Sequence, residues 1–210
     1  MPAEGKTKNM ITDWITLFSE QLRNTSYLEW FAVLFSSLQV VFAQKNSILT
    51  YPFGILGTLL SIFLLFEVAL YAESFLNLYY FIMSIYGWLN WSKNKTGFSL
   101  PVTHAGKQDW LYTACIVAVG WLVLYLILSR FTTSDVPVWD AIVSSFAWAG
   151  MWLMAKRKVE NWILLNISNF IAVPLLFHKE IFIYALLTIF LFIVACFGYF
   201  SWKKQVQLAK

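Results

Sequence analysis

The sequence predicts an all-α integral membrane protein with seven transmembrane helices, and three observations lead to this prediction. Of the 210 residues, 60% are hydrophobic and 12% charged, whereas soluble domains have about 45–50% and 25%. The chain contains 19 Phe, 11 Trp and 10 Tyr, more aromatic surface than a soluble fold of this size can bury. Seven apolar runs also approach the ~20 residues that a helix needs to cross a bilayer.

The same composition excludes several other classes of protein. The amino-acid composition of this chain differs from that of disordered chains, coiled coils, collagens and disulfide scaffolds. The net charge of +4 requires no nucleic-acid partner, because basic residues of a membrane protein mark its cytoplasmic side. Cys115 and Cys196 lie within apolar runs, so we expect buried packing residues rather than a disulfide or a metal pair.

The elements are expected in the following order. Residues 1–26 form a polar tail and an amphipathic helix on the membrane surface, and residues 27–210 form a single transmembrane domain. One face of the surface helix carries the apolar residues Ile11, Trp14, Ile15, Phe18 and Leu22. The seven transmembrane helices are expected near residues 27–43, 49–66, 70–91, 109–129, 136–154, 159–176 and 180–200.

The positions of lysine and arginine predict the orientation of these helices. Counted segment by segment, the side that holds the amino terminus collects five of these residues and the opposite side ten. Cytoplasmic segments carry the excess of positive charge. The amino terminus is therefore expected outside and the carboxyl terminus inside.

The chain also contains an internal repeat. A shift of 111 residues aligns residues 45–93 with 156–204 without a gap, and the matched pairs include Lys45 with Lys156, Gly87 with Gly198 and Trp91 with Trp202. We therefore expect two three-helix repeats, 27–91 and 136–202, joined by the linker helix 109–129. Because the first repeat and the linker together cross the membrane an even number of times, the second repeat begins on the same side as the first and has the same orientation. Parallel repeats of this kind, as in SWEET sugar carriers, are a transporter architecture.

Polar side chains follow one face of the helix at 70–91. Glu73, Asn77, Tyr80 and Ser84 recur at helical spacing, and intramembrane polar residues are typical of substrate pathways. Near the outer end, Glu73 could attract a cation or couple transport to protons. The alternative interpretation is an ordinary glutamate at the membrane interface.

A second set of candidate binding residues lies on the helix at 159–176. Trp162, Asn166 and Asn169 share one face within two turns. Asparagine offers donors and an acceptor to a ribose, an amide or an aminopyrimidine, and tryptophan offers a flat face for stacking. Helix rise places Asn169 and Asn77 within about 15 Å and about 10 Å of opposite membrane faces, so we expect both to converge on one ligand with Asn166. Hydrogen bonding between packed helices is the alternative.

The remaining polar positions indicate no catalytic chemistry. Asp140 is expected to stabilise the start of its helix, and His178 has no second histidine near it. The sequence contains no metal-ligand spacing, phosphate-binding glycine loop or nucleophile motif. We therefore expect no catalytic residues, no metal and no cofactor, which disfavours a membrane-embedded enzyme.

Several motifs resemble those of the PnuC family of bacterial vitamin transporters. This resemblance implies a three-one-three arrangement of helices in the bacterial cytoplasmic (inner) membrane. It also implies facilitated diffusion of a B vitamin, which a separate cytoplasmic kinase then traps by phosphorylation. The motifs are Tyr51-Pro52-Phe53-Gly54, Leu70-Tyr71-Ala72, Tyr86-Gly87-Trp88, Trp91-Ser92-Lys93, Pro137-Val138-Trp139-Asp140 and Val159-Glu160-Asn161-Trp162.

The sequence departs from the family at positions that bind the vitamin in nicotinamide riboside carriers. Leu165 replaces the second Trp of a Trp-x-x-Trp-x-x-x-Asn motif, and Asn166 follows it. Asn77 replaces a Gln and Gly57 an Asn. These departures favour a different cargo. Thiamine is the first candidate, because its aminopyrimidine and cationic ring would suit Trp162, Asn166 and Glu73. Nicotinamide riboside is the second candidate, followed by other vitamins.

The leading functional hypothesis is thus a facilitator of vitamin uptake. A proton-coupled vitamin carrier is one alternative, and a SWEET-type sugar carrier is another, although the Pro-Gln motif of that family is absent. The expected partners are the vitamin, the lipid bilayer and, functionally, the kinase. The sequence leaves the oligomeric state open, a homo-oligomer included.

Overall fold

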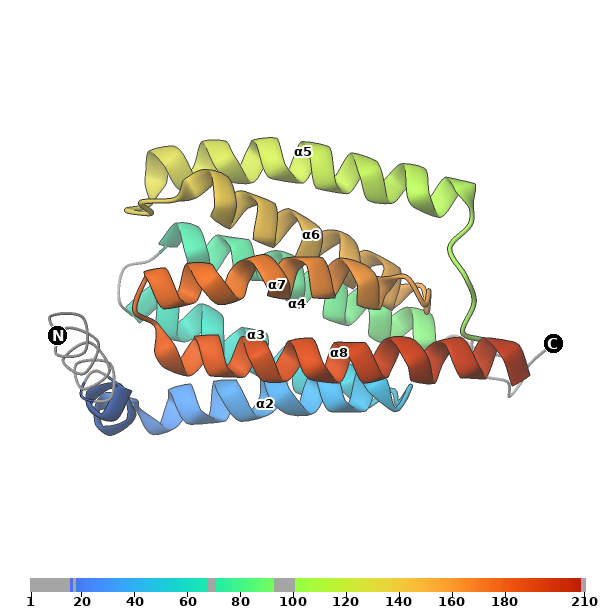
Figure 1. Ribbon diagram of the computed structural model, residues 1–210, viewed down its shortest axis with the longest axis horizontal. Helices are drawn as coiled ribbons and strands as arrows, with labels where there is room; N and C mark the ends of the chain where they lie inside the picture. Colours follow the sequence, from blue (N-terminus) through green and yellow to red (C-terminus); the bar gives the residue numbers. More distant parts are fainter. Residues whose placement is uncertain (1–15, 17, 68–70, 93–100, 209–210) are drawn as a thin grey trace, which may run out of the picture.

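In the part of the chain that the structure describes, seven long helices lie side by side along one axis (Figure 1). The structure is a computed structural model, and it describes residues 16, 18–67, 71–92 and 101–208, apart from four side chains near the start of α4 (Tyr71, Ala72, Glu73 and Phe75). Within these residues the helices are α2 (Tyr27–Gln44), α3 (Thr50–Glu67), α4 (Tyr71–Ser92), α5 (Lys107–Phe131), α6 (Pro137–Ala155), α7 (Asn161–His178) and α8 (Phe182–Leu208).

Each helix occupies one of the seven apolar runs, with ends that differ from the expected ones by about one or two residues. The exception is α8, which continues to Leu208. Six of the described helices are long and apolar enough to cross a membrane, and α4 is the one that falls short. The stripe that contains Asn77 and Tyr80 lowers its mean hydropathy. The chain is therefore an all-helical, multi-pass membrane protein.

The helix starts have clear local causes. At α2, the Ser26 hydroxyl accepts a hydrogen bond from the Glu29 amide, and the Glu29 carboxylate accepts one from the Ser26 amide. This capping box satisfies two donors that would otherwise lack a partner. At α6 the first residue is Pro137, whose fixed φ suits the first helical position and which has no amide hydrogen to satisfy.

The outer surface of the bundle is strongly apolar. Phe170, Phe197 and Phe200 are each more than 60% exposed. In a soluble protein an apolar surface of this extent would mark a binding site or cause aggregation. Around a bundle of spanning helices, lipid chains cover it.

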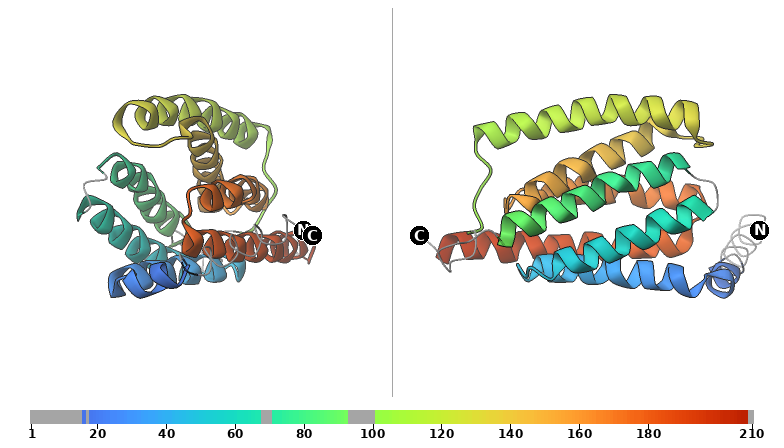
Figure 2. Two further views of the ribbon diagram at one scale, coloured as in Figure 1. Left: turned by 60° about the vertical axis from the view of Figure 1, so that its left-hand side comes forward. Right: turned by 180° about the vertical axis from the view of Figure 1, so that it is seen from behind.

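The described helices form two three-helix units, α2–α4 and α6–α8. In each unit the middle helix packs against both of its neighbours, and between the units α2 packs on α8 and α4 on α6. We call the end of the bundle where α2 and α6 begin the Asp140 end, and the opposite end the Trp202 end. The helix α5 lies along α6 at the edge of the bundle (Figure 2).

The two units have corresponding helix bounds. Adding 111 to the bounds of α3 gives the bounds of α7, and adding it to the last residue of α2 gives the last residue of α6. The turns that follow also correspond, because Asn46 and Arg157 have positive φ values of 55° and 53°. The same 111-residue offset thus relates these helix bounds and these two turns.

The amino-terminal segment contacts the bundle directly. The described residues from 18 to 24 are helical and cross the Asp140 end (Figure 1). The Gln21 side chain donates to the Glu180 carbonyl and accepts from the Phe182 amide at 3.1 Å, so it caps α8. Ile11, Trp14 and Ile15 of the expected surface helix lie outside the described residues.

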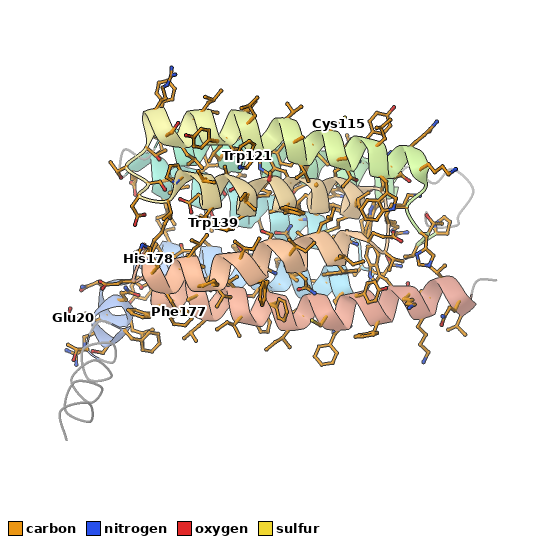
Figure 3. All side chains as sticks on the ribbon, turned by 45° about the horizontal axis from the view of Figure 1, so that its top comes forward. Glu20, Cys115, Trp121, Trp139, Phe177 and His178 are labelled. Carbon is orange, nitrogen blue, oxygen red and sulfur yellow. The ribbon has the colours of Figure 1, made fainter. Side chains whose placement is uncertain are left out.

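The expectation of buried cysteines is wrong for Cys115. Cys115 is exposed on α5 (Figure 3), and Cys196 is half-buried on α8; neither forms a disulfide. The physical reason is the position of α5 at the edge of the bundle, where an apolar residue faces lipid as readily as protein. Hydrophobicity alone does not distinguish these two environments in a membrane protein.

Candidate functional site

A cavity of about 800 Å³, which we call the vestibule, opens at the Asp140 end between the two units. Five helices contribute to its wall. Its polar groups include the carboxylates of Glu29 and Glu67, and within the described residues no lysine or arginine forms an ion pair with either. The lining residues are Ser26, Glu29, Ser61, Leu64, Leu65, Glu67, Asn77, Leu176, Ile181 and Tyr184.

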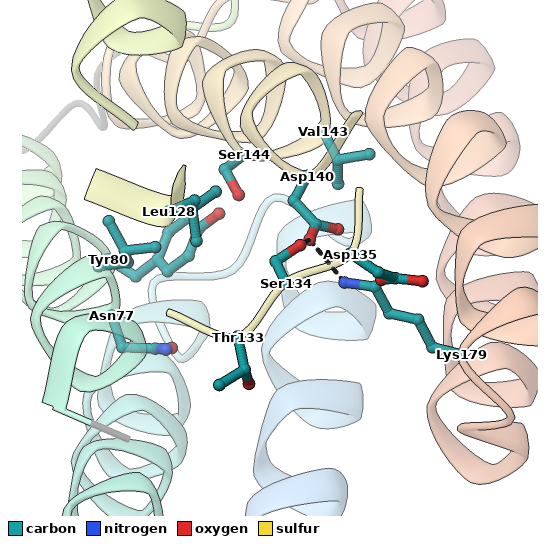
Figure 4. Close-up of a pocket in the computed structure, with 11 residues that line it drawn as sticks. Asn77, Tyr80, Leu128, Thr133, Ser134, Asp135, Asp140, Val143, Ser144 and Lys179 are labelled. Atoms are coloured by element: carbon teal, nitrogen blue, oxygen red, sulfur yellow. Dashed lines mark hydrogen bonds and ion pairs between the residues drawn. The ribbon is translucent and has the colours of Figure 1, made fainter. Parts of the chain in front are cut away.

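A second cavity of about 440 Å³, the side chamber, lies between α4, α5 and α6 (Figure 4). The Asp140 carboxylate accepts hydrogen bonds from the Lys179 ammonium and the Ser134 hydroxyl. The remaining wall combines apolar, hydroxyl and amide groups with a second carboxylate, that of Asp135. Lining residues are Leu76, Asn77, Tyr80, Leu128, Thr133, Ser134, Asp135, Asp140, Val143, Ser144 and Lys179.

Asn77 lines both the vestibule and the side chamber. It is half-buried about one and a half turns into α4. Its amide has two donor hydrogens and one acceptor oxygen, so the residue type can bind hydroxyl or amide groups of a ligand in either cavity. Tyr80, one turn further along α4, lines the side chamber. The structure thus brings these two candidate residues together.

The other candidates on α4 are placed differently. Ser84 is fully buried, and a Cβ atom added at Gly54 would lie 3.1 Å from its hydroxyl oxygen. Ser84 therefore faces α3 rather than a described cavity. The side chain of Glu73 lies outside the described residues.

Trp162 and Asn166 line a third cavity, an apolar side groove between α7 and α8. The Asn166 amide donates a hydrogen bond to the Cys196 sulfur at 3.5 Å. Phe170 and Phe200 form part of the same wall and are exposed, so the groove faces the outside of the bundle. Asn77 is not among the residues that line this groove.

Asn169 is half-buried on α7 and lines none of the three cavities described here. The structure therefore places Asn77, Asn166 and Asn169 in different surroundings. Their convergence on a single ligand remains a prediction.

Trp162 is a central part of an aromatic cluster that closes the Trp202 end. It is fully buried, and its ring meets Trp202 edge-on at 5.6 Å. A Cβ atom added at Gly198 would lie 2.6 Å from the Trp162 ring, so only glycine allows this contact. In the first unit, Tyr51 is packed in the same way on Gly87 and meets Trp91 edge-on.

Two indole hydrogen bonds join the units within this cluster. Trp91 of the first unit donates to the Ala155 carbonyl at 3.1 Å, and Trp202 of the second unit donates to the Ala43 carbonyl at 3.0 Å. Each carbonyl lies at the end of the first helix of the other unit. The bonds are therefore reciprocal and hold the Trp202 end closed.

A buried arginine reinforces this closure from the turn between α6 and α7. The guanidinium carbon of Arg157 lies 3.9 Å from the centre of the Trp91 ring, within the range of a cation–π interaction. Burial lowers the pKa of Arg157 from its ordinary value, and the nearby Tyr51 hydroxyl partly offsets this effect. The cation thus ties the connecting turn of one unit to the other unit.

Sequence reasoning missed several polar groups of the site. Asp140 lies in the first turn of α6, where it was expected. Sequence reasoning did not find that its carboxylate pairs with Lys179, or that His178 contacts Asp135 at 3.1 Å. Glu29 and Glu67 attracted no functional hypothesis. The 111-residue shift could have found Glu29, because it aligns Glu29 with Asp140.

Comparison with known proteins identifies relatives over most of the chain. The model of the family described as "Nicotinamide mononucleotide transporter" matches residues 26–204. The nicotinamide riboside transporter PnuC of Escherichia coli is 24% identical over 211 residues, with 87% of each chain covered. The PnuC of Neisseria mucosa is 25% identical, and the match covers 87% of this chain and 74% of the relative.

A solved structure supports the fold. The crystal structure of the vitamin B3 transporter PnuC superposes with a TM-score of 0.71 and 23% identity, covering 95% of this chain and 91% of that chain. The family and these relatives are transporters, so the chain is a membrane transporter and not an enzyme. Because the family model covers well over half of its residues, the chain belongs to the nicotinamide mononucleotide transporter family.

Proposed function

We propose that this protein carries nicotinamide riboside across the bacterial cytoplasmic membrane and that Asn77 helps to bind it. The relatives described above are named for this vitamin. The observation that carries the proposal is the position of Asn77 in the walls of two cavities that also contain carboxylates. An amide can bind the ribose hydroxyls or the carboxamide of the cargo, and the carboxylates suit its positively charged pyridinium ring.

The Asp140 end faces the outside in this proposal. The lysine and arginine residues concentrate in the tails and turns of the Trp202 end, which favours a cytoplasmic location for that end. The vestibule and side chamber open at the Asp140 end, while the aromatic cluster closes the other. The protein would then be in an outward-open state.

Release of the cargo requires the Trp202 end to open. We treat α2–α4 and α6–α8 as two parallel repeats linked by α5, an interpretation that the corresponding helix bounds support. Rocking of one repeat against the other around a fixed site is a common transport mechanism. The Trp91 and Trp202 hydrogen bonds between the repeats would break in this step.

Transport is proposed to be facilitated diffusion, with trapping by a cytoplasmic kinase. A proton-coupled carrier is the alternative, and Glu73 its candidate group. Uptake into proteoliposomes with and without a pH gradient separates the two. Accumulation of nicotinamide riboside above equilibrium only in the presence of the gradient would contradict facilitated diffusion.

The cargo is tested by binding to the purified full-length protein. We expect nicotinamide riboside to bind more tightly than thiamine, riboflavin or glucose. This order of affinities tests two opposing indications. The departures from the family motif at Leu165 and Asn166 favoured thiamine, whereas the relatives are named for nicotinamide riboside. Tighter binding of thiamine would overturn the proposal; tightest binding of glucose would favour the sugar-carrier alternative.

Replacing Asn77 tests the proposed site. Asn77→Ala should weaken nicotinamide riboside binding by about 3-fold to 10-fold, the effect of losing one or two hydrogen bonds. Asn24→Ala is the matched control, because Asn24 is an exposed asparagine before α2. Equal affinities of the Asn77 variant and the parent would remove Asn77 from the site.

A further inference from the structure

Two carboxylates at the Asp140 end occupy corresponding positions in the two units. The 111-residue shift aligns Glu29 with Asp140. Each lies in the first turn of the first helix of its unit, where the helix dipole favours a negative charge. Glu29 lines the vestibule and Asp140 the side chamber, and the two cavities share Asn77.

The surroundings of the two carboxylates differ in charge. The Lys179 ammonium lies 2.5 Å from the Asp140 carboxylate, and the two side chains are 24% and 21% exposed. Glu29 accepts a hydrogen bond from the Ser26 amide at 2.6 Å, and no lysine or arginine in the described part of the chain pairs with it. The shift aligns Lys179 with Val68, an apolar residue.

Lysine is suited to a reversible contact of this kind. Its ammonium is a compact charge on a flexible four-carbon stem, and Lys179 lies in the short turn that follows α7. The pair is only partly shielded from water, so the ammonium can leave for solvent at modest cost. A second cation in the side chamber could then take its place beside Asp140.

The side chamber has the chemistry to hold such a cation with a sugar attached. Its volume of about 440 Å³ lies in the usual range for small-ligand pockets, about 300–1,000 Å³. Tyr80 offers an aromatic face, and Asn77, Thr133 and Ser144 offer hydrogen-bonding groups.

We propose that Asp140 binds the positive charge of the cargo and that Lys179 is a built-in competitor which occupies Asp140 when cargo is absent. This inference rests on the proposed function, because it assumes a cationic cargo such as nicotinamide riboside. Lys179 then sets how strongly the protein prefers charged over uncharged nicotinamide nucleosides. Glu29, which has no such competitor, attracts the cation into the vestibule.

The test compares nicotinamide riboside with its uncharged reduced form, which keeps the ribose and the carboxamide. Dissociation constants are measured for both with the full-length protein in nanodiscs. The quantity of interest is the ratio of the two constants. Lys179→Met should change this ratio in favour of the cationic form by about 3-fold to 10-fold, as expected for a partly exposed ion pair.

Further variants separate charge from folding. Lys179→Arg keeps the positive charge and should leave the ratio close to that of the parent. Adding Asp140→Asn to Lys179→Met removes the carboxylate and should abolish the gain. Lys156→Met is the matched control, because Lys156 forms a similar pair with Asp109 at 3.0 Å at the Trp202 end and should not alter the ratio.

Two outcomes would overturn the proposal. One is a ratio that stays at the parent value in Lys179→Met, whether the two affinities are unchanged or change equally. The other is a shift of the ratio in Lys156→Met as large as that in Lys179→Met. Failure of the proposed function gives a different result, because the parent protein would then bind neither form of nicotinamide riboside. The inference about Lys179 would fail in that case too. Thermal unfolding of each variant in the same nanodiscs verifies that it is folded.

Discussion

Tyr51 of α3 packs onto Gly87 of α4, and 111 residues later Trp162 of α7 packs onto Gly198 of α8. The two contacts occupy the same place in their units, but the aromatic residues differ. Trp162 extends to the side groove between α7 and α8, and Tyr51 lines none of the three described cavities. The two units thus bury an aromatic side chain at corresponding positions, and the residue type determines what else each ring contacts.

The Asp140 end shows the same relation between the two units. Glu29 and Asp140 begin corresponding helices, but only Asp140 has a lysine beside it in the described structure. Corresponding positions of the two units therefore carry one carboxylate that pairs with a lysine and one that pairs with no lysine or arginine in the described residues.

The largest expected effect comes from removing the paired aromatic rings. Tyr51→Ala and Trp162→Ala should each lower the free energy of unfolding by about 3–5 kcal/mol, because both rings are fully buried. If Trp162 also stacks on the cargo, its variant alone should lose a further ~1–3 kcal/mol of binding. Chemical denaturation and cargo titration in detergent measure the two quantities.

Conservative variants provide the control for this prediction. Tyr51→Phe and Trp162→Phe keep an aromatic ring and should lose less stability. Unchanged unfolding of Trp162→Ala would contradict its burial in the aromatic cluster, and equal losses of binding in both alanine variants would remove the distinction between the two halves.

The glycines opposite these rings should be the next most sensitive positions. An added Cβ would lie 2.2 Å from Tyr51 at Gly87 and 2.6 Å from Trp162 at Gly198. Overpacking of this kind costs about 1–3 kcal/mol, so Gly87→Ala should destabilise more than Gly198→Ala. A double-mutant cycle with Tyr51→Ala should show that the cost at Gly87 falls when the ring is absent. Strict additivity would place the clash elsewhere.

Substitutions at the starts of α2 and α6 are expected to differ less in their effect on the free energy of unfolding. Ser26→Ala removes the capping box of α2 and should cost about 1 kcal/mol. Pro137→Ala at the start of α6 removes no capping side chain and should cost less. Thermal unfolding compares the two, with the exposed Ser129→Ala as control. A larger loss at Pro137 would reverse the comparison.

The smallest effect is expected for the contact between the His178 ring and the Asp135 carboxylate at the rim of the Asp140 end. His178 and Asp135 are 61% and 59% exposed, so water and salt screen their interaction. His178→Gln should change the free energy of unfolding by less than about 0.5 kcal/mol. Unfolding at low and high ionic strength measures this. A marked, salt-sensitive loss would mean that the pair is structurally important.

Much of the architecture follows from local sequence. A continuous apolar run of sufficient length forms a helix in a membrane because the backbone must satisfy its own hydrogen bonds there. The starts and ends of α2 through α7 were therefore predictable to within a few residues. The 111-residue shift was visible in the alignment of Gly87 with Gly198 and of Trp91 with Trp202, and all four residues lie at contacts between helices.

The candidate site was predictable only in part. The stripe on α4 led to Asn77 and Tyr80, which do line cavities. Helical spacing also grouped Asn166 with Asn169, but it could not show that Asn166 contacts Cys196 of α8 in a groove at the outside of the bundle.

The sequence by itself determined the membrane class and the seven helices, because these depend on hydrophobicity along the chain. Its 111-residue shift predicted that α2–α4 and α6–α8 correspond. Only the tertiary structure decided that Lys179 pairs with Asp140 and that Trp162 is buried against Gly198 rather than open to the Asp140-end cavities. The physical reason is that helical periodicity relates side chains to their own helix axis. The rotation and tilt of each helix, which close packing at small residues sets, determine which neighbour that face meets.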